Sequence, residues 1–152
     1  MLFEEYKLKN VSLRNRVVMA PMTRNQSPGG VPTDDVVSYY SRRAKAEVGM
    51  IITEGIEVSH EASSAYPNVP RLDSNDAKEG WKKVVAGIRD NHGVVIAQLW
   101  HCGGFRKLGM QPNPEVPGYT ASGLVKPGKK VAYEMTLEDI KETIEAYASD
   151  AK

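Results

Sequence analysis

The stretch that decides the fold is Val94-Val95-Ile96-Ala97-Gln98-Leu99-Trp100-His101. Its apolar part is short and rich in β-branched residues, which is typical of a strand covered on both faces. Only the brief link Asn91-His92-Gly93 separates it from a helical pattern, in which apolar residues recur at Trp81, Val84, Val85 and Ile88. A helix followed at once by a buried strand predicts a parallel sheet built from strand–helix units.

The same alternation occurs twice more towards the N-terminus. Apolar runs at Val17–Ala20 and Met50–Thr53 predict two further strands, and the pattern from Asp34 to Glu47 predicts the helix between them. Thr33 is the candidate N-cap of that helix, and Ser74 is the candidate cap of the helix that carries Trp81. These elements give three consecutive strand–helix units, because a third helix follows the last strand.

The third helix begins at Thr136, with Asp139 three residues later as a variant of the capping box. Its apolar stripe consists of Leu137, Ile140, Ile144, Tyr147 and Ala148. At the other end of the chain, short strands at Tyr6–Leu8 and Val11–Leu13 flank Lys9-Asn10. This pattern predicts a hairpin in which Asn10 takes the positive φ of the turn.

Loop lengths show which edge of the sheet carries function. The links from helix to strand are short, whereas those from strand to helix are long and span 24–32, 56–73 and 102–135. Long connections in a compact domain are usually functional. Gathering them at the C-terminal ends of the strands is the pattern of a TIM barrel's active face, although a doubly wound sheet binds its ligand at the same edge.

A complete barrel needs eight such units and typically about 250 residues. We therefore interpret residues 1–152 as one partial α/β barrel domain, with a hairpin over residues 1–15 and about three βα units. Three units alone leave parallel strand edges and the barrel interior uncovered, which soluble proteins rarely tolerate. The missing strands are expected from further residues or from a second chain.

Composition excludes several classes of protein. The chain is 41% apolar and 26% charged with a net charge of +1, so nothing directs it to nucleic acid or an anionic membrane. The single cysteine, Cys102, excludes an intramolecular disulfide and a multi-cysteine zinc site. This cysteine usage indicates a reducing, cytoplasmic setting. No run resembles a signal peptide or a membrane span.

Three strand ends carry the residues with chemical potential. Thr23 offers a hydroxyl just after Ala20-Pro21-Met22, and Gly55 permits a flat ligand to approach the backbone closely. Strand alternation places Gln98 and Trp100 on one face, where an amide beside an aromatic ring suits a planar heteroaromatic ligand. Each residue alone also has a purely structural interpretation, as a turn residue or, for Trp100, as part of the core.

Other reactive residues have weaker patterns. His101 and Cys102 are adjacent in an extended segment and therefore point to opposite faces, which disfavours a nucleophilic pair. His60, Glu61 and His92 lack metal-ligand spacing, and no metal site is expected.

Taken in order, several motifs resemble the old yellow enzyme family of FMN-dependent ene-reductases. The resemblance covers nearly the whole chain from Leu2 to the third helix. It rests on the segments Asn15–Arg24, Pro32-Thr33-Asp34, Tyr39-Tyr40, Ile51-Ile52-Thr53-Glu54-Gly55, Tyr66-Pro67-Asn68 and Gln98-Leu99-Trp100-His101.

This resemblance implies a (β/α)8 barrel that holds FMN at its C-terminal face and transfers hydride from NAD(P)H, through the flavin, to an activated alkene such as an α,β-unsaturated carbonyl. It implies that Ala20, Pro21, Met22 and Thr23 line the flavin ring, with the Thr23 hydroxyl near the C4 carbonyl and N5. Gly55 is then close to the ring and Gln98 pairs with its pyrimidine edge. Trp100 and Tyr66 flank the substrate.

The chain also departs from the family pattern. Gly103-Gly104 stands where members commonly have Gly-Arg, and Arg106 follows later. The family's substrate-binding His/Asn pair, its proton-donating Tyr and its flavin-phosphate loops lie on later strands. No catalytic residue is therefore assigned within residues 1–152.

Two alternatives remain open. One is a non-catalytic half-barrel that self-associates or requires a partner chain. The other is a related flavin barrel with another substrate, such as a dienoyl-CoA or amine dehydrogenase type, whose additional iron–sulfur domain would need several cysteines.

Overall fold

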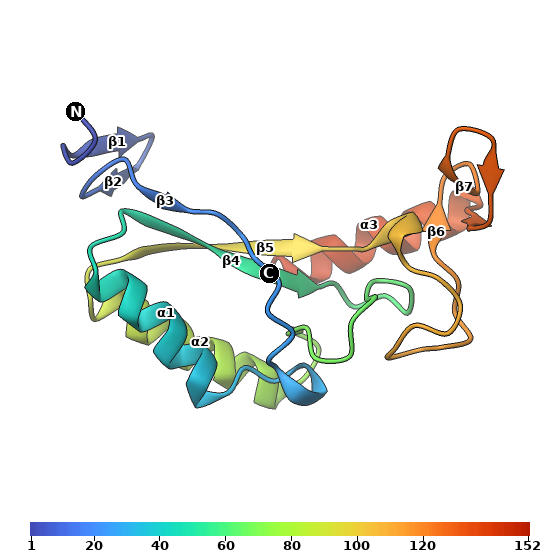
Figure 1. The fold of residues 1–152 in the computed structure, drawn as a ribbon, viewed down its shortest axis with the longest axis horizontal. Coiled ribbons are helices and arrows are strands. Elements are labelled where there is room, and N and C mark those ends of the chain that lie inside the picture. The colour runs from blue at the N-terminus through green and yellow to red at the C-terminus, as the bar shows by residue number, and fades with distance from the viewer.

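A three-stranded parallel sheet with two helices packed on one face organises the chain (Figure 1). The computed structural model describes all of residues 1–152. The sheet order is β3-β4-β5, which is the order of the strands in the chain. The elements are β1 (Tyr6–Leu8), β2 (Val11–Leu13), β3 (Val18–Met19), η1 (Pro28–Gly30), α1 (Asp34–Lys45), β4 (Met50–Glu57), α2 (Asn75–Arg89), β5 (Val94–Trp100), η2 (Gly103–Phe105), β6 (Tyr119–Thr120), β7 (Leu124–Lys126), β8 (Lys129–Lys130), β9 (Tyr133–Glu134) and α3 (Leu137–Asp150).

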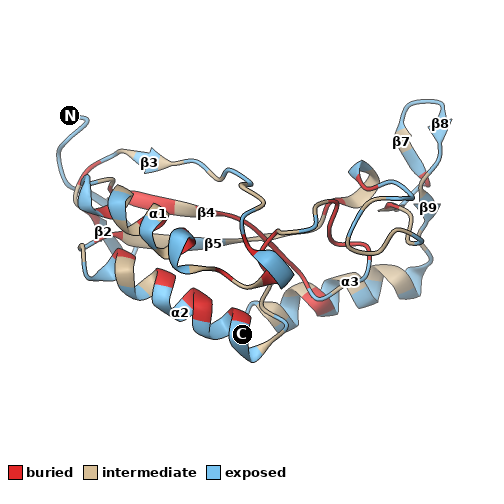
Figure 2. Ribbon diagram, turned by 60° about the horizontal axis from the view of Figure 1, so that its bottom comes forward, coloured by how far each residue is buried: buried red, intermediate tan, exposed pale blue.

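The hydrophobic core lies between this sheet and the pair α1 and α2. Met19, Ile51 and Val95 are neighbours across the three strands and face the helices. Buried residues are concentrated along β4 and on the inward sides of the helices (Figure 2). The cluster comprises Val36, Tyr40, Ala44, Ile51, Ile56, Trp81, Val84 and Ile88. Full burial of each larger apolar side chain stabilises the fold by roughly 1.5–3 kcal/mol.

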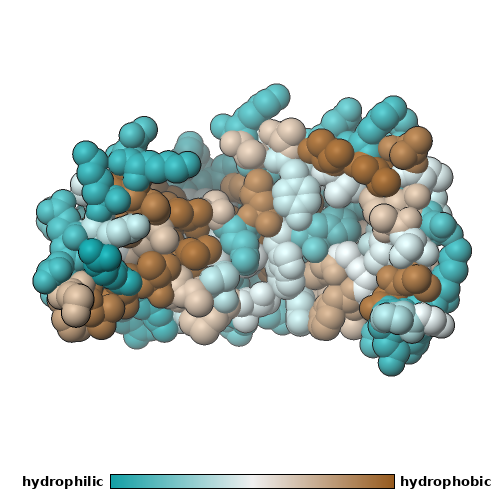
Figure 3. Space-filling view, turned by 90° about the horizontal axis from the view of Figure 1, so that it is seen from above, coloured by the Kyte–Doolittle hydropathy of each residue, from teal (hydrophilic) through white to brown (hydrophobic).

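The opposite face of the sheet is apolar and open. Val18 and Ile96 are 42% and 44% exposed there, whereas Met50 is buried. Seen from this side, hydrophobic surface lies over the sheet (Figure 3). In a closed barrel this face forms the interior. The hairpin β1–β2 covers its N-terminal end and encloses an apolar pocket of about 230 Å³ against Val18 and Met50.

Helix boundaries largely follow the capping predictions. The Ser74 hydroxyl accepts the Ala77 N–H at 3.1 Å, and Thr136 forms a reciprocal capping box with Asp139. Both caps are confirmed. Thr33 is the N-cap of α1, as predicted, with extended backbone, although its side chain makes no capping hydrogen bond. Asp34 and Asp35 in the first turn complement the helix dipole there.

Three other predictions need correction. Lys9, with φ of 51°, takes the positive φ in the hairpin turn instead of Asn10. β4 continues to Glu57 instead of ending at Thr53, because the charges of Glu54 and Glu57 are each paired with an arginine. The segment 102–135, expected as a loop, contains η2 and four short strands, two of which form the hairpin β7–β8.

α3 lies apart from the sheet and exposes most of its predicted apolar stripe. Leu137 is 80% and Ile144 is 61% exposed, and Ala146 is the one buried residue of the helix. The helix is fixed at its C-terminal end, where Asp150 accepts the N–H and hydroxyl of Ser59 at 2.6 and 2.8 Å. Neither α3 nor any other helix combines the length and apolar character needed to span a membrane.

Candidate functional site

The predicted site residues meet at one edge of the sheet. β3, β4 and β5 are parallel, so their C-terminal ends lie together. Gly55 and Gln98 are directly opposite each other across β4 and β5, and the segment Ala20–Thr23 leaves β3 beside them. Residues from the ends of three separate strands therefore lie at the same edge, as the strand–helix pattern predicted.

A β-bulge in β4 produces the pairing of Gly55 with Gln98. Ile52 pairs with Ile96 and Gly55 with Gln98, so two residues of β4, Thr53 and Glu54, oppose one residue of β5. The Thr53 hydroxyl accepts the Gln98 N–H at 3.1 Å and donates to the Glu54 carbonyl at 2.8 Å. The side chain of Thr53 therefore replaces the ladder acceptor that the bulge removes.

Gly55 is required by the indole of Trp100. A Cβ at this glycine would lie 2.1 Å from Trp100 Cε3 and 2.6 Å from Cδ2, closer than any real contact. Sequence analysis attributed this glycine to the approach of a flat ligand, but the indole fills that side of the backbone. A ligand can reach Gly55 only from another direction, and its contact with a cofactor stays a prediction.

Trp100 belongs to an aromatic cluster that also contains Tyr66 and Phe105. The ring centroids of Tyr66 and Trp100 are 6.1 Å apart, and those of Tyr66 and Phe105 are also 6.1 Å apart with nearly parallel planes. Phe105 is 58% exposed, so one side of the cluster faces solvent. Sequence analysis named Tyr66 and Trp100 but missed Phe105, whose large apolar side chain beside Gly103-Gly104 was the available signal.

The polar groups at this edge are neutral and available. The Thr23 hydroxyl and the side-chain amide of Gln98 make no hydrogen bond within the chain, and the contact of Gln98 with Thr53 is made by its backbone N–H. Thr23 and Met22 are exposed, and Ala20 adds little bulk. A hydroxyl and an amide on one open edge can both donate to and accept from a planar ligand.

Arg24 and Glu54 hold the segment that carries Thr23. Arg24 Nε and Nη2 donate to Glu54 Oε1 at 3.0 and 2.7 Å, and the Arg24 N–H donates to Oε2 at 3.1 Å. Glu54 is fully buried, and its N–H donates to the Tyr40 hydroxyl at 2.7 Å. Burial raises the pKa of Tyr40 to about 12, so this hydroxyl stays protonated. No role for Arg24, Tyr40 or Glu54 was predicted from the sequence, although a carboxylate within a buried strand usually requires a charged or hydrogen-bonding partner.

Arg106 fixes the loop that follows β5. Its guanidinium is buried and has no carboxylate partner; it donates instead to backbone carbonyls of two loops. Nε donates to Val116 O at 2.9 Å and Nη2 to Met110 O at 3.0 Å, and the Ser64 and Asn113 carbonyls complete the set. Arg106 therefore ties the loop after β5 to the loop after β4 and holds neighbouring Phe105 against Tyr66.

His101 is half-buried and Cys102 is buried, and the surroundings of both suppress their reactivity. His101 Nε2 is 3.1 Å from His60 Nδ1, and burial together with His60 lowers the pKa of His101 to about 4. Burial raises the pKa of the Cys102 thiol to about 11, which suppresses the nucleophilic thiolate. The two histidines connect the loops after β4 and β5, a contact that their sequence separation concealed.

Comparison with known proteins identifies the family. The model of the NADH:flavin oxidoreductase / NADH oxidase family matches residues 1–152, the whole chain. The chain belongs to this family. The resemblance to the old yellow enzymes is thereby confirmed.

Relatives within the family include plant reductases. The chain is 38% identical over 116 residues to 12-oxophytodienoate reductase 7 of Oryza sativa subsp. japonica, covering 76% of this chain and 29% of the relative. It is 34% identical over 116 residues to 12-oxophytodienoate reductase 2 of Arabidopsis thaliana, covering 76% of this chain and 30% of that one.

Solved structures of the family confirm the architecture. Morphinone reductase superposes with a TM-score of 0.88 at 29% identity, covering 99% of this chain and 43% of that chain. A morphinone reductase N189A mutant in complex with tetrahydroNAD gives 0.87 at 29% identity, with 99% and 44% covered. The chain thus spans less than half the length of these family members and has the fold of part of a TIM barrel.

Proposed function

We propose that this chain is the N-terminal portion of an FMN-dependent ene-reductase. In that reaction hydride passes from NAD(P)H, by way of FMN, to an activated alkene such as an α,β-unsaturated carbonyl. The observation that carries the proposal is the meeting of Thr23, Gly55, Gln98 and Trp100 at the C-terminal edge of β3, β4 and β5, in a chain that matches the family over its full length.

The residues present fit the flavin ring. The Thr23 hydroxyl and the Gln98 amide have no partner within the chain, and both lie at the edge where barrel enzymes bind ligands. Ala20, Pro21 and Met22 supply a largely apolar neighbourhood for a planar group. FMN, when bound, supplies the redox chemistry, and the protein contributes binding, orientation and electrostatics.

Each residue has a distinct role in this proposal. Thr23 would hold the flavin by donating a hydrogen bond from its hydroxyl near the C4 carbonyl and N5, where negative charge increases on reduction. Gln98 would pair with the pyrimidine edge, because its amide both donates and accepts. Trp100 and Tyr66 border the alkene and exclude water. Phosphate binding and proton donation come from the remaining barrel units, which the family members possess and this chain does not span.

The test is to purify the protein natively with any chain that accompanies it, and to record its intact mass and visible absorbance with added FMN. We expect flavin absorbance that NADPH bleaches and that 2-cyclohexen-1-one restores. Thr23→Ala should lower the flavin potential and slow reduction while leaving FMN bound. Thr33→Ala is the matched control, because that threonine makes no side-chain capping bond. A protein that binds no FMN under these conditions would overturn the proposal.

The open sheet face supports a second candidate, a non-catalytic half-barrel that self-associates. Val18 and Ile96 are 42% and 44% exposed on this side of the sheet. A large exposed apolar patch on a soluble protein usually marks an interaction site. Sedimentation of the isolated chain as a stable, folded monomer would exclude this candidate.

A further inference from the structure

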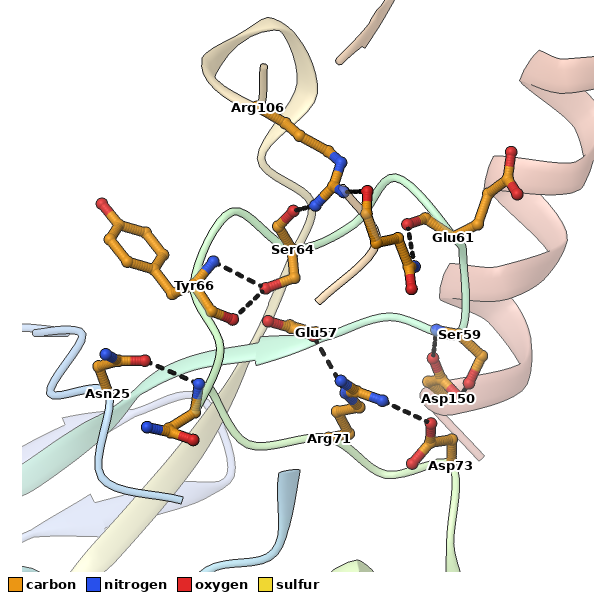
Figure 4. A network of polar contacts seen from close by, with 12 residues as sticks. Asn25, Glu57, Ser59, Glu61, Ser64, Tyr66, Arg71, Asp73, Arg106 and Asp150 are labelled. Carbon is orange, nitrogen blue, oxygen red and sulfur yellow. Dashed lines mark hydrogen bonds and ion pairs between the residues drawn. The ribbon is translucent and has the colours of Figure 1, made fainter. Parts of the chain in front are cut away.

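Glu57, at the end of β4, is a buried carboxylate that is only half satisfied. The residue is 3% exposed. Its Oε2 accepts from Arg71 Nε at 3.2 Å, while its buried Oε1 has no hydrogen-bond partner (Figure 4). Arg71 Nη1 also lies 3.7 Å from Asp73 Oδ2, so the guanidinium interacts with two carboxylates. A buried acceptor without a partner costs about 1–3 kcal/mol, more when charged.

Ser64 lies beside Glu57 and controls the backbone of Tyr66. The Ser64 hydroxyl accepts the Tyr66 N–H at 3.1 Å and donates its proton to the Tyr66 carbonyl at 2.8 Å (Figure 4). Ser64 and Glu57 line the same polar cavity, and Ser64 acts to lower the pKa of Glu57. A hydroxyl has one proton to donate and two lone pairs. Here the Ser64 hydroxyl donates its proton to the Tyr66 carbonyl and uses one lone pair for the Tyr66 N–H, so its second lone pair has no donor.

The two charge states of Glu57 therefore make opposite demands on Ser64. A protonated Glu57 can donate to the free lone pair of Ser64 and leave both bonds to Tyr66 intact. An ionised Glu57 can only accept, and the proton it requires is the one that Ser64 gives to the Tyr66 carbonyl. Ionisation thus sets Glu57 in competition with the Tyr66 turn.

The charged groups around Glu57 come from several elements. Arg71 and Asp73 belong to the loop before α2, and Cys102 and Arg106 to the loop after β5. A polar cavity of about 260 Å³ lies alongside, and its lining includes His60, Glu61, Ser59 and Asn113. Asp150 of α3 accepts the backbone N–H of Ser59, which lines this cavity. Burial is the main cause that raises the pKa of Glu57 to about 7, against the lowering effects of Ser64 and Arg71.

We propose that Glu57 is a positioning residue for Tyr66, and that gain or loss of one proton at Glu57 moves the Ser64 hydroxyl proton between the Tyr66 carbonyl and the Glu57 carboxylate. Because Tyr66 packs on Trp100 and Phe105, the change is transmitted to the aromatic cluster. The link to substrate binding rests on the proposed function, whereas the switch is a property of this chain alone.

The direct test follows the Tyr66 backbone amide by ¹H–¹⁵N NMR of the full chain between about pH 5 and 9. We expect its chemical shift to titrate near neutrality in the unmodified chain and to be constant in Glu57→Gln. In Ser64→Ala the titration amplitude should fall severalfold, because the relaying hydroxyl is gone. The remaining amide peaks report whether each variant is folded, and Ser64→Ala keeps the test valid if Glu57→Gln does not fold.

Two controls identify the titrating group. His60→Gln, which removes the imidazole that contacts His101 in the adjoining loop, should leave the Tyr66 titration intact. Glu61→Gln, which removes a neighbouring exposed carboxylate, should also leave it intact. A Tyr66 amide that does not titrate, a titration that survives in Glu57→Gln, or one that disappears in His60→Gln would overturn the proposal.

The functional consequence separates this inference from the proposed function. In the flavin-loaded protein, KM for 2-cyclohexen-1-one should change across the same pH range by about two- to tenfold, the equilibrium effect of one hydrogen bond, with kcat little affected. Glu57→Gln should remove this pH dependence of KM. Titration of Tyr66 in a chain that binds no FMN would refute the proposed function alone, and FMN binding without that titration would refute the switch alone.

Discussion

Replacing Gly55 by alanine tests the packing of β4 against Trp100. The new Cβ would lie 2.1 Å from Trp100 Cε3 and 3.0 Å from Cγ, so the indole must move. Overpacking of this kind typically costs 1–3 kcal/mol. Alanine also restricts the unfolded chain and recovers roughly 0.5–1 kcal/mol relative to glycine in a strand. The expected net loss is therefore about 1–2 kcal/mol of unfolding free energy.

Urea unfolding monitored by far-UV circular dichroism measures this loss. With a slope of about 1–3 kcal/mol/M for a chain of this size, the urea midpoint should fall by about 0.3–2 M. Trp100→Leu removes the ring that the new methyl group meets, so in that background Gly55→Ala should cost nothing or stabilise. The double-mutant cycle then yields a coupling of about 1–3 kcal/mol. A coupling below ~0.5 kcal/mol, within ordinary additivity, would refute the assigned contact.

Four further perturbations test the buried charges and the thiol. Glu54→Gln leaves the Arg24 guanidinium without its carboxylate and should cost about 3–5 kcal/mol in urea unfolding. Asp35→Asn, at an exposed position where only the helix-dipole interaction is lost, should cost less than about 1 kcal/mol. Arg106→Met leaves four backbone carbonyls without a donor, at a cost in unfolding free energy of about 1–3 kcal/mol each that the removal of a buried charge partly offsets. Limited proteolysis should then cut residues 106–118 first, and an unchanged cleavage pattern would contradict the anchoring role of Arg106. The pKa of Glu57 is raised to about 7, so between about pH 4 and 7 Glu57 holds a proton in the folded state that it has lost in the unfolded state. The unfolding free energy should therefore fall by about 3 kcal/mol as the pH rises through this range, and Glu57→Gln should remove most of this pH dependence. Cys102, with its pKa raised to about 11, should react with iodoacetamide at pH 8 about 10²-fold more slowly than in the urea-unfolded chain, and equal rates would show an accessible thiol.

The repeating fold was predictable because it depends on local patterns. The apolar runs of β3, β4 and β5 and the stripe of α2 have the periods of strand and helix, and their alternation determines a parallel sheet. Parallel order in turn places the ends of those strands at one edge. The position of Thr23, Gly55 and Gln98 follows from this geometry without knowledge of any long-range contact.

Features that depend on distant partners could not be predicted in the same way. β4 extends past Thr53 because Arg24 and Arg71, remote in sequence, pair with Glu54 and Glu57. The short strands β6 and β9 pair although residues 121–132 lie between them, and neither strand has an apolar periodicity that would predict it. For Gly55, the sequence predicted a close approach to the backbone but assigned it to a flat ligand, whereas the structure shows the indole of Trp100 there.

Buried charge fixes each of the loops that surround the candidate site. Glu54 holds the segment after β3 through Arg24, Glu57 holds the loop before α2 through Arg71, and Arg106 holds the loop after β5 through backbone carbonyls. Burying charge is costly, and an apolar residue of similar size often gives equal stability. The charged groups instead fix the orientation of the loops, because a bidentate or forked hydrogen bond specifies the relative orientation of its two partners as well as their distance. Thr23, Tyr66 and Phe105 each lie within a few residues of one of these anchors, so the polar interior of this edge serves to orient the residues of the site.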